Sequence, residues 1–238
     1  MDDTPDHAAP FAPFGATEVI DRTRFQKVVA RTMSANAATI PHVTHCDDID
    51  VTGLERHRQA LAPEARVSPL IFLIKAVVEA LARYPQFNAS LSPDGGALVL
   101  KKYVNIGIAV DGPLGLLVPV LRDADSKDVA MLAAELKEVS TLARTRGLPL
   151  SAMSGGCFTI SSLGGIGGTY FTPIINAPEV AILGATGIVT RPVWDGAAFV
   201  PRQILPLSLS YDHRVINGAD AARFCKAIEA SLAQYEQA

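Results

Sequence analysis

The spacing of apolar and polar residues along the chain predicts an interleaved set of helices and strands. Apolar residues recur at helical spacing over 23–37, over 127–146 and from about 219 onward, which predicts amphipathic helices. The segment 70–84 is apolar nearly all round, so we expect a central buried helix there. Apolar runs bounded by turn residues predict strands, and these runs cover 41–51, 87–91, 97–100, 104–110, 116–120, 157–161, 180–184, 187–193 and 199–209.

Small polar residues ahead of three helical segments are predicted helix caps. Thr52 precedes a short helix that carries Leu54, Arg58 and Leu61. Ser68 is followed by a first-turn proline and then by the buried helix. Ser126 is the predicted cap of the helix over 127–146.

The order of these elements predicts an α/β (α+β) fold. Strands and helices do not alternate regularly, as they would in a parallel doubly wound sheet, so we expect a mixed sheet with helices packed on one side. One domain is predicted over 20–238. Residues 1–19 are acidic and rich in Pro and Ala, so we expect a disordered arm or linker remnant there.

Composition narrows the class of protein. The chain has 238 residues, 49% hydrophobic and 19% charged, so it can bury a sizeable core. A net charge of −3 argues against nucleic-acid binding. The longest apolar run, over 69–78, is interrupted by Lys75 and is too short to cross a bilayer. Three widely spaced cysteines favour a reducing compartment without disulfides or zinc, so we predict a soluble cytoplasmic protein.

His213 is the first candidate catalytic residue. It follows a predicted strand, lies between Asp212 and Arg214, and precedes an Asn217-Gly218 turn into a helix. Histidine is the side chain whose ordinary pKa lies near neutral pH, so this placement suits a general base. A structural role for a single histidine is equally consistent with these local features.

A strand that ends in Ser161 and Ser162 runs into a glycine-rich loop over 163–168. A hydroxyl at a strand end can donate to an oxyanion, and glycines allow close approach of a ligand. The spacing matches neither a dinucleotide fingerprint nor a phosphate-binding loop, so a simple connecting loop is the alternative. His42 and His45 lack a third ligand nearby, so we expect a structural pair and no metal site.

The segment 212–218 resembles the His-x-x-x-Asp-Gly signature of 2-oxo acid dehydrogenase acyltransferases and chloramphenicol acetyltransferases. Further segments resemble the same family in the same order, and they lie at 40–44, 87–91, 105–111, 115–120, 156–161 and 176–184. The chain is therefore identified as a member of this family. The segments 159–168, 176–180 and 218–220 resemble the acetyltransferases of pyruvate dehydrogenase complexes more than the succinyltransferases.

This resemblance implies a chloramphenicol acetyltransferase-like two-layer sandwich and an acetyltransferase reaction. In the family, acetyl passes between the thiol of a dihydrolipoyl group and the thiol of coenzyme A. His213 then acts as general base, and Ser161 donates to the oxyanion, with Ser162 as the second candidate. Asn217 stands where the signature has Asp, so it cannot supply a negative charge and we expect a positional role.

The resemblance also implies residues that bind coenzyme A, which is a substrate here. Arg58, Ser68, Asp111 and Ser161 match coenzyme-binding positions of the family, and Ser162 is added as a neighbour. Each has an ordinary alternative, because Ser68 can serve only as a cap and Asp111 only as a turn residue. The lipoyl group is expected from another domain or chain, because residues 1–19 show no lipoyl-lysine context.

Family resemblance further implies a homotrimer with active sites between subunits, so His213 and Ser161 come from neighbouring protomers. Lipoyl domains and 2-oxo acid dehydrogenase components are the expected partners. The segment 230–238 is more polar than the apolar tails that join trimers into larger cores. We therefore expect trimers, with a weak or absent larger core.

Two other functions stay open on the sequence. One is coenzyme A-dependent transfer of another acyl group, or transfer to a small hydroxyl or amine acceptor. The other is a non-catalytic core or assembly component, for which Asn217 is the one supporting feature.

Overall fold

The computed structural model describes residues 8–112 and 115–236. The main helices are α1 (Arg24–Thr39), α2 (Thr52–Ala60), α3 (Pro69–Arg83), α4 (Val129–Thr145) and α5 (Gly218–Ala233). The strands are β1 (His42–Asp50), β2 (Ala89–Leu91), β3 (Leu98–Leu100), β4 (Ile106–Ala109), β5 (Val120–Leu121), β6 (Phe158–Ser162), β7 (Ala181–Ala185), β8 (Val189–Trp194) and β9 (Phe199–Asp212).

A mixed sheet forms the centre of the fold. Its strand order is β1-β9-β7-β6-β4-β5. Strand β8 pairs with the first part of β9, residues 199–204. The β4–β6 and β6–β7 pairs are parallel, whereas β1–β9, β7–β9, β8–β9 and β4–β5 are antiparallel. The short strands β2 and β3 form a separate antiparallel hairpin. The prediction of a mixed sheet is confirmed.

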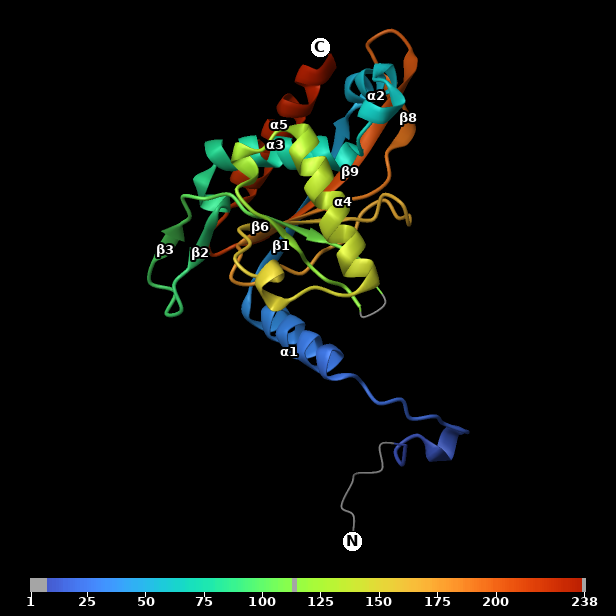
Figure 1. Ribbon diagram of the computed structural model, residues 1–238, viewed down its shortest axis with the longest axis vertical. Helices are drawn as coiled ribbons and strands as arrows, with labels where there is room; N and C mark the ends of the chain where they lie inside the picture. The colour runs from blue at the N-terminus through green and yellow to red at the C-terminus, as the bar shows by residue number, and fades with distance from the viewer. Residues whose placement is uncertain (1–7, 113–114, 237–238) are drawn as a thin grey trace.

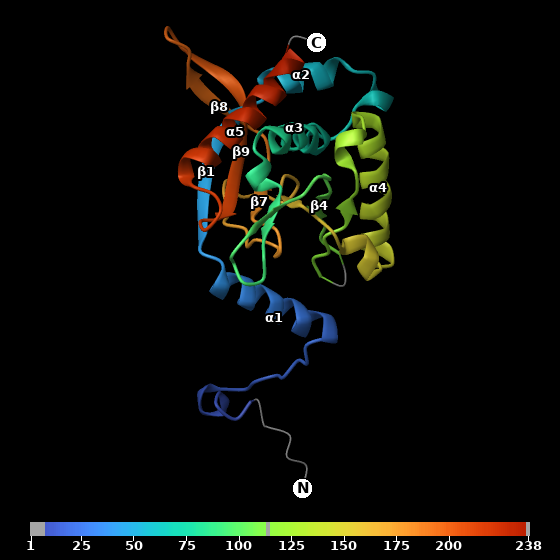
Figure 2. The same ribbon diagram turned by 90° about the vertical axis from the view of Figure 1, so that its left-hand side faces the viewer.

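Helices α3, α4 and α5 lie together on one side of this sheet. Helix α1 lies away from them, at the end of the molecule from which the N-terminal segment extends (Figures 1 and 2). The hydrophobic core fills the space between these helices and the sheet. At its centre the rings of Phe87 and Phe224 stack with centroids 4.1 Å apart, and Phe158 of the sheet lies 5.8 Å from Phe224. The two-layer sandwich expected from the family resemblance is therefore present.

Helix α3 begins as the sequence predicts. The Ser68 hydroxyl accepts a hydrogen bond from the backbone N–H of Leu70 at 3.3 Å, and Pro69 is the first helical residue. Most of its side chains are buried, which makes α3 the central helix of the layer. This fixes Ser68 at one end of a buried element.

The other two predicted caps are wrong. Thr52 is the first residue of α2 itself, and its hydroxyl donates to Asp50 at 2.5 Å while accepting from the backbone of Gln203. Ser126 ends a 3-10 turn, and Asp128 caps α4 instead by accepting from the backbone N–H of Met131 at 2.8 Å.

The predicted strand over 116–120 is shorter than expected, because only a bridge between Val110 and Leu117 precedes β5. Apart from a 3-10 turn at Ala12–Phe14, residues 8–22 run without regular structure away from the body of the protein (Figure 1). The rest of the predicted arm, residues 1–7, lies outside the described residues.

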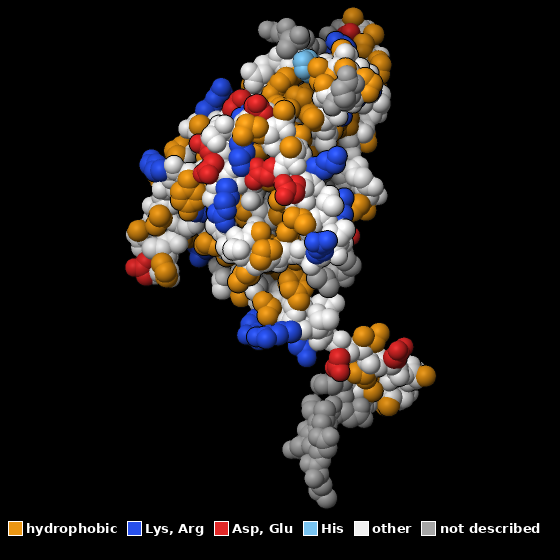
Figure 3. Space-filling model, viewed as in Figure 1, with side chains coloured by type: hydrophobic (Ala, Val, Ile, Leu, Met, Phe, Trp, Pro, Cys, Tyr) orange, Lys and Arg blue, Asp and Glu red, His pale blue; other side chains and the backbone are white. Residues whose placement is uncertain are grey.

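Charges of both signs are interspersed with apolar side chains over the face in Figure 3. Within the described part of the chain, every helix is too short or too polar to cross a membrane.

Candidate active site

His213 follows directly on β9, and hydrogen bonds fix the backbone around it. The Asp212 N–H donates to the carbonyl of Val180 at 2.9 Å, and the His213 N–H donates to that of Pro41 at 3.1 Å. The carboxylate of Asp212 is buried and accepts from the backbone and the guanidinium of Arg214, at 2.6 to 3.1 Å. The imidazole of His213 is exposed, so it is free to meet a substrate or another chain.

Asn217 connects this segment to α5. Its side-chain oxygen accepts from the backbone N–H of Asp220 at 2.9 Å, as an N-cap does. Its amide group also donates to the Asp220 carboxylate at 2.8 Å. Both contacts hold the start of the helix, and they give Asn217 a positional role in the turn after His213.

Ser161 and Ser162 end β6 on opposite faces of the sheet. Ser162 is in register with Ala185 and, through β7, with Leu207, and both of these face the core under the helices. Because successive side chains of a strand alternate, Ser161 points to the other face.

Ser161 and His213 are far apart within one chain. Ser161 is in register with Gly184, and Gly184 with Ser208 of β9. From Ser208, His213 lies about 17 Å further along the chain, at about 3.4 Å per residue, and two strand spacings add about 10 Å sideways. The separation is therefore about 20 Å, which excludes direct cooperation inside a single protomer.

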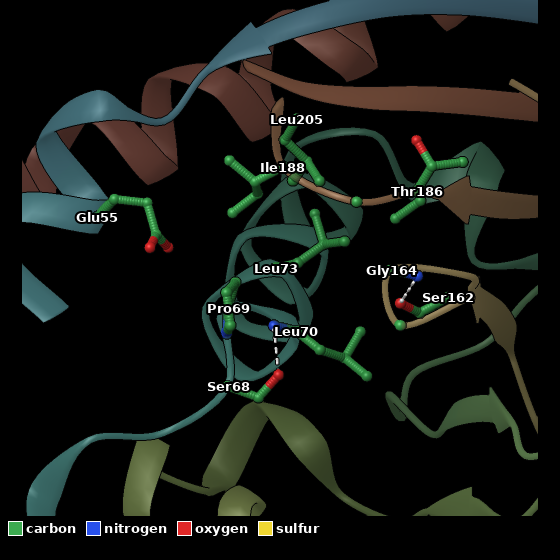
Figure 4. Close-up of a pocket in the computed structure, with 13 residues that line it drawn as sticks. Glu55, Ser68, Pro69, Leu70, Leu73, Ser162, Gly164, Thr186, Ile188 and Leu205 are labelled. Atoms are coloured by element: carbon green, nitrogen blue, oxygen red, sulfur yellow. Dashed lines mark hydrogen bonds between the residues drawn. The ribbon is translucent and has the colours of Figure 1, made fainter. Parts of the chain in front are cut away.

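Ser68 and Ser162 come together at a cleft of about 400 Å³ beside α3. Figure 4 shows Ser68 at the start of α3 and Ser162 at the end of β6, on two sides of Leu70. We call this the α3 cleft, and it is lined by Glu55, Ser68, Pro69, Leu70, Leu73, Ser162, Gly164, Gly165, Ala185, Thr186, Gly187, Ile188 and Leu205.

A second cleft, of about 420 Å³, shares Ser68, Leu70 and Ser162 with the first. We call it the α4 cleft, and it is lined by Val67, Ser68, Leu70, Ile71, Ile108, Ala109, Val110, Ala133, Leu136, Lys137, Ser140, Arg144 and Ser162. Sequence reasoning missed Lys137, Ser140 and Arg144, because polar residues on an amphipathic helix are ordinary solvent-facing positions. Only the packing of α4 beside β4 shows that they border a cleft.

Arg58 and Asp111, the other predicted coenzyme-binding residues, lie next to these clefts but do not line them. The guanidinium of Arg58 donates to the Glu55 carboxylate at 2.8 Å and to the carbonyl of Val67 at 2.9 Å. Glu55 lines the α3 cleft, so this ion pair stands beside it. Asp111 is exposed and directly follows Val110 of the α4 cleft. The turn residues 113–114 after it lie outside the described residues.

His42 has a structural role. Its Nε2 accepts from the backbone N–H of Ile175 at 3.0 Å, so that nitrogen carries no proton. Its Nδ1 then donates to the carbonyl of Ile40 at 2.8 Å. Both ring nitrogens of His42 are therefore satisfied by the backbone.

Glu179 is a buried acid that the sequence did not single out. The residue is 4% exposed, and one carboxylate oxygen has no hydrogen-bond partner among the described residues. Burial raises the pKa of Glu179 to about 7, while Thr159 and Lys101 oppose the rise. A carboxyl group in this position changes charge near neutral pH.

The family of 2-oxoacid dehydrogenase acyltransferases (catalytic domain) matches residues 14–238. The chain belongs to this family. The chain is 50% identical to the dihydrolipoyllysine-residue acetyltransferase component of the pyruvate dehydrogenase complex of Haemophilus influenzae, over 94% of this chain and 41% of the relative. For the same component of Pseudomonas aeruginosa the identity is 53%, over 94% of this chain and 42% of the relative. The chain thus spans about two fifths of the length of these curated relatives.

Solved structures agree with this family membership. The dihydrolipoamide acetyltransferase (E2p) of Azotobacter vinelandii superposes with a TM-score of 0.91 at 51% identity, covering 95% of this chain and 96% of that one. A structure of the cubic core of the pyruvate dehydrogenase multienzyme complex also gives 0.91, at 52% identity and the same coverage. Chloramphenicol acetyltransferase gives 0.59 at 16% identity over 91% of this chain and 100% of that one, which shows a shared fold. The predicted family and fold are confirmed.

Proposed function

We propose that this chain transfers an acetyl group between a dihydrolipoyl thioester and coenzyme A. One observation carries the proposal. The Azotobacter vinelandii enzyme was investigated for the role of a serine, a histidine and an asparagine in its catalytic mechanism. The sequence intervals between those three residues equal the intervals between Ser161, His213 and Asn217. This match supports catalytic roles for Ser161 and His213 and a positioning role for Asn217.

His213 acts as the general base on the coenzyme A thiol. A thiol with a pKa of about 8.5 is mostly protonated at neutral pH, whereas the thiolate is the nucleophile. The imidazole takes the proton as the sulfur attacks the acetyl carbonyl, and Ser161 donates a hydrogen bond to the oxygen that becomes negative. When the tetrahedral intermediate collapses, the carbon–sulfur bond to dihydrolipoyl breaks, and the imidazolium returns the proton to the departing sulfur.

The active site is completed by a second copy of the chain. The separation of about 20 Å between Ser161 and His213 supports this, since one hydroxyl and one imidazole must meet at the same carbonyl. A closed ring of identical subunits supplies such a pair at every interface, and a homotrimer is the assembly proposed. Similarity to the cubic-core structure at 52% identity supports a trimer as the building unit.

Coenzyme A is proposed to occupy the α3 and α4 clefts. Ser68 and Ser162 line both clefts, and Arg58 and Asp111 stand beside them. The acyl donor is an acetylated lipoyl group carried by another domain or chain. A 2-oxo acid dehydrogenase component attaches the acetyl group to it. The names of the relatives, all components of pyruvate dehydrogenase complexes, support these partners.

The test is acetyl transfer between acetyl-coenzyme A and free dihydrolipoamide, followed as S-acetyldihydrolipoamide. Succinyl-coenzyme A and a small hydroxyl acceptor such as chloramphenicol are run beside it. We expect turnover with the acetyl donor and dihydrolipoamide. Faster transfer to the small acceptor would favour the chloramphenicol acetyltransferase-like alternative, and no transfer at all would favour a non-catalytic assembly component.

The assembly and the location are tested separately. Light scattering of the purified chain is expected to give the mass of a trimer. A much larger closed particle would show that the polar segment 230–238 does not prevent assembly into a larger core. Cell fractionation tests the proposed cytoplasmic location.

A further inference from the structure

The α4 cleft carries a row of polar side chains that the proposed reaction leaves without a role. Lys137, Ser140 and Arg144 line it from one side of α4. Residues three, four and seven apart on a helix share one face, so these side chains form a single stripe. At about 1.5 Å per residue, the two cations stand about 10 Å apart along the helix axis.

This stripe is positively charged and unpaired. Both Lys137 and Arg144 are exposed, and neither forms an ion pair with any other residue that the structure describes. The lining of the α4 cleft contains no acidic residue. Glu138 is exposed next to Lys137 in the sequence but lies off the stripe.

The two clefts differ in charge. Glu55 faces the α3 cleft, and its carboxylate is already paired with the guanidinium of Arg58. That cleft therefore offers no unpaired cation from this ion pair. The α4 cleft offers two, beside an apolar wall formed by Leu70, Ile71 and Leu136.

Coenzyme A likewise combines a charged end with a mostly neutral arm, which matches the two cations and the apolar wall of the α4 cleft. Its phosphates lie at the nucleotide end, and a mostly neutral pantetheine arm carries the thiol at the other end. We propose that Lys137 and Arg144 bind the phosphate groups of coenzyme A, with the Ser140 hydroxyl between them as a further donor. The pantetheine arm then runs past the apolar wall toward Ser162. This inference rests on the proposed function, because it assigns one end of the same substrate.

The test removes both charges and compares two acceptors. The double variant Lys137→Gln/Arg144→Gln is assayed with coenzyme A and with pantetheine, which carries the same thiol without phosphates. The matched control, Arg83→Gln/Lys102→Gln, removes two exposed positive charges outside both clefts. We expect KM for coenzyme A to rise roughly 10-fold or more in the cleft variant, with kcat nearly unchanged. For pantetheine, kcat/KM should stay within about twofold of the wild type, because no phosphate contact is lost.

A second readout is inhibition by adenosine 3′,5′-bisphosphate, which carries phosphates but no thiol arm. Its inhibition constant against coenzyme A should rise in the cleft variant and not in the control. An unchanged KM for coenzyme A in the cleft variant, or an equal loss with pantetheine, would overturn the inference. If the wild-type chain used no coenzyme A at all, the proposed function itself would fail, which is a distinguishable result.

Discussion

Ser161 and Ser162 are consecutive residues, yet their side chains leave β6 on opposite faces of the sheet. Ser162 faces the helical layer and lines both clefts. Ser161 faces the side away from the helices, where a second copy can reach it. The two hydroxyl groups are therefore expected to serve different steps.

Replacing each serine separately tests this division. Ser161→Ala should lower kcat for acetyl transfer by roughly 10²–10³-fold, because it removes a donor to the oxyanion, with KM for coenzyme A little changed. Ser162→Ala should chiefly raise KM for coenzyme A. Steady-state kinetics with both substrates measure the split, and the two variants serve as controls for each other. The reverse pattern would move the oxyanion role to Ser162.

His213→Ala should reduce kcat by roughly 10²–10⁴-fold, because the thiol of the acceptor loses its general base. Thermal unfolding should be little affected, since the imidazole is exposed and the backbone contacts of the segment do not depend on it. His45→Asn, which replaces a histidine of β1 away from this turn, is the matched control and should keep most of the activity. Turnover that survives His213→Ala would refute the assignment.

Mixing two inactive variants tests whether the site is shared between subunits. Ser161→Ala and His213→Ala chains are unfolded together, refolded and assayed. In randomly mixed trimers, about a quarter of the interfaces combine an intact serine from one chain with an intact histidine from its neighbour. We expect about a quarter of the wild-type activity from the mixture and almost none from either variant refolded alone. A mixture as inactive as its components would place both residues in the same chain's site.

Glu179 should make stability depend on pH. Burial raises its pKa from 4.5 to about 7, so the folded chain holds a proton that the unfolded chain has lost between these values. The free energy of unfolding should therefore fall by about 3 kcal/mol as pH rises from 4.5 to 7, and level off above that range. Urea unfolding at several pH values measures this slope.

Glu179→Gln is the diagnostic variant, because it keeps the shape of the side chain and cannot ionise. Its stability should change much less over the same pH range than that of the wild type. Glu138→Gln, at an exposed position of α4, is the control and should keep the wild-type slope. Parallel pH profiles for wild type and Glu179→Gln would show that another group is responsible.

The sequence by itself predicted most elements and the family. Strong local signals account for this: Ser68-Pro69 begins α3, apolar runs mark most strands, and the turn after His213 begins α5. The two wrong cap predictions, at Thr52 and Ser126, also have a local cause. Thr52 and Ser126 are good cap residues, but hydrogen bonds to Asp50 and to the carbonyl of Asp123 engage their hydroxyls.

Only the tertiary structure decided which candidate residues lie together. Sheet register is a long-range property, and it sets the separation of Ser161 from His213 and the opposite faces of the two serines. The same holds for Lys137 and Arg144, whose spacing in the sequence is that of any solvent-facing helix stripe until α4 packs beside β4. The burial that raises the pKa of Glu179 also comes from residues distant in the sequence. Neighbouring residues determine local features such as helix starts and turns. The distances between candidate residues and the burial of their side chains are set only when the whole chain folds, because they depend on residues far apart in the sequence.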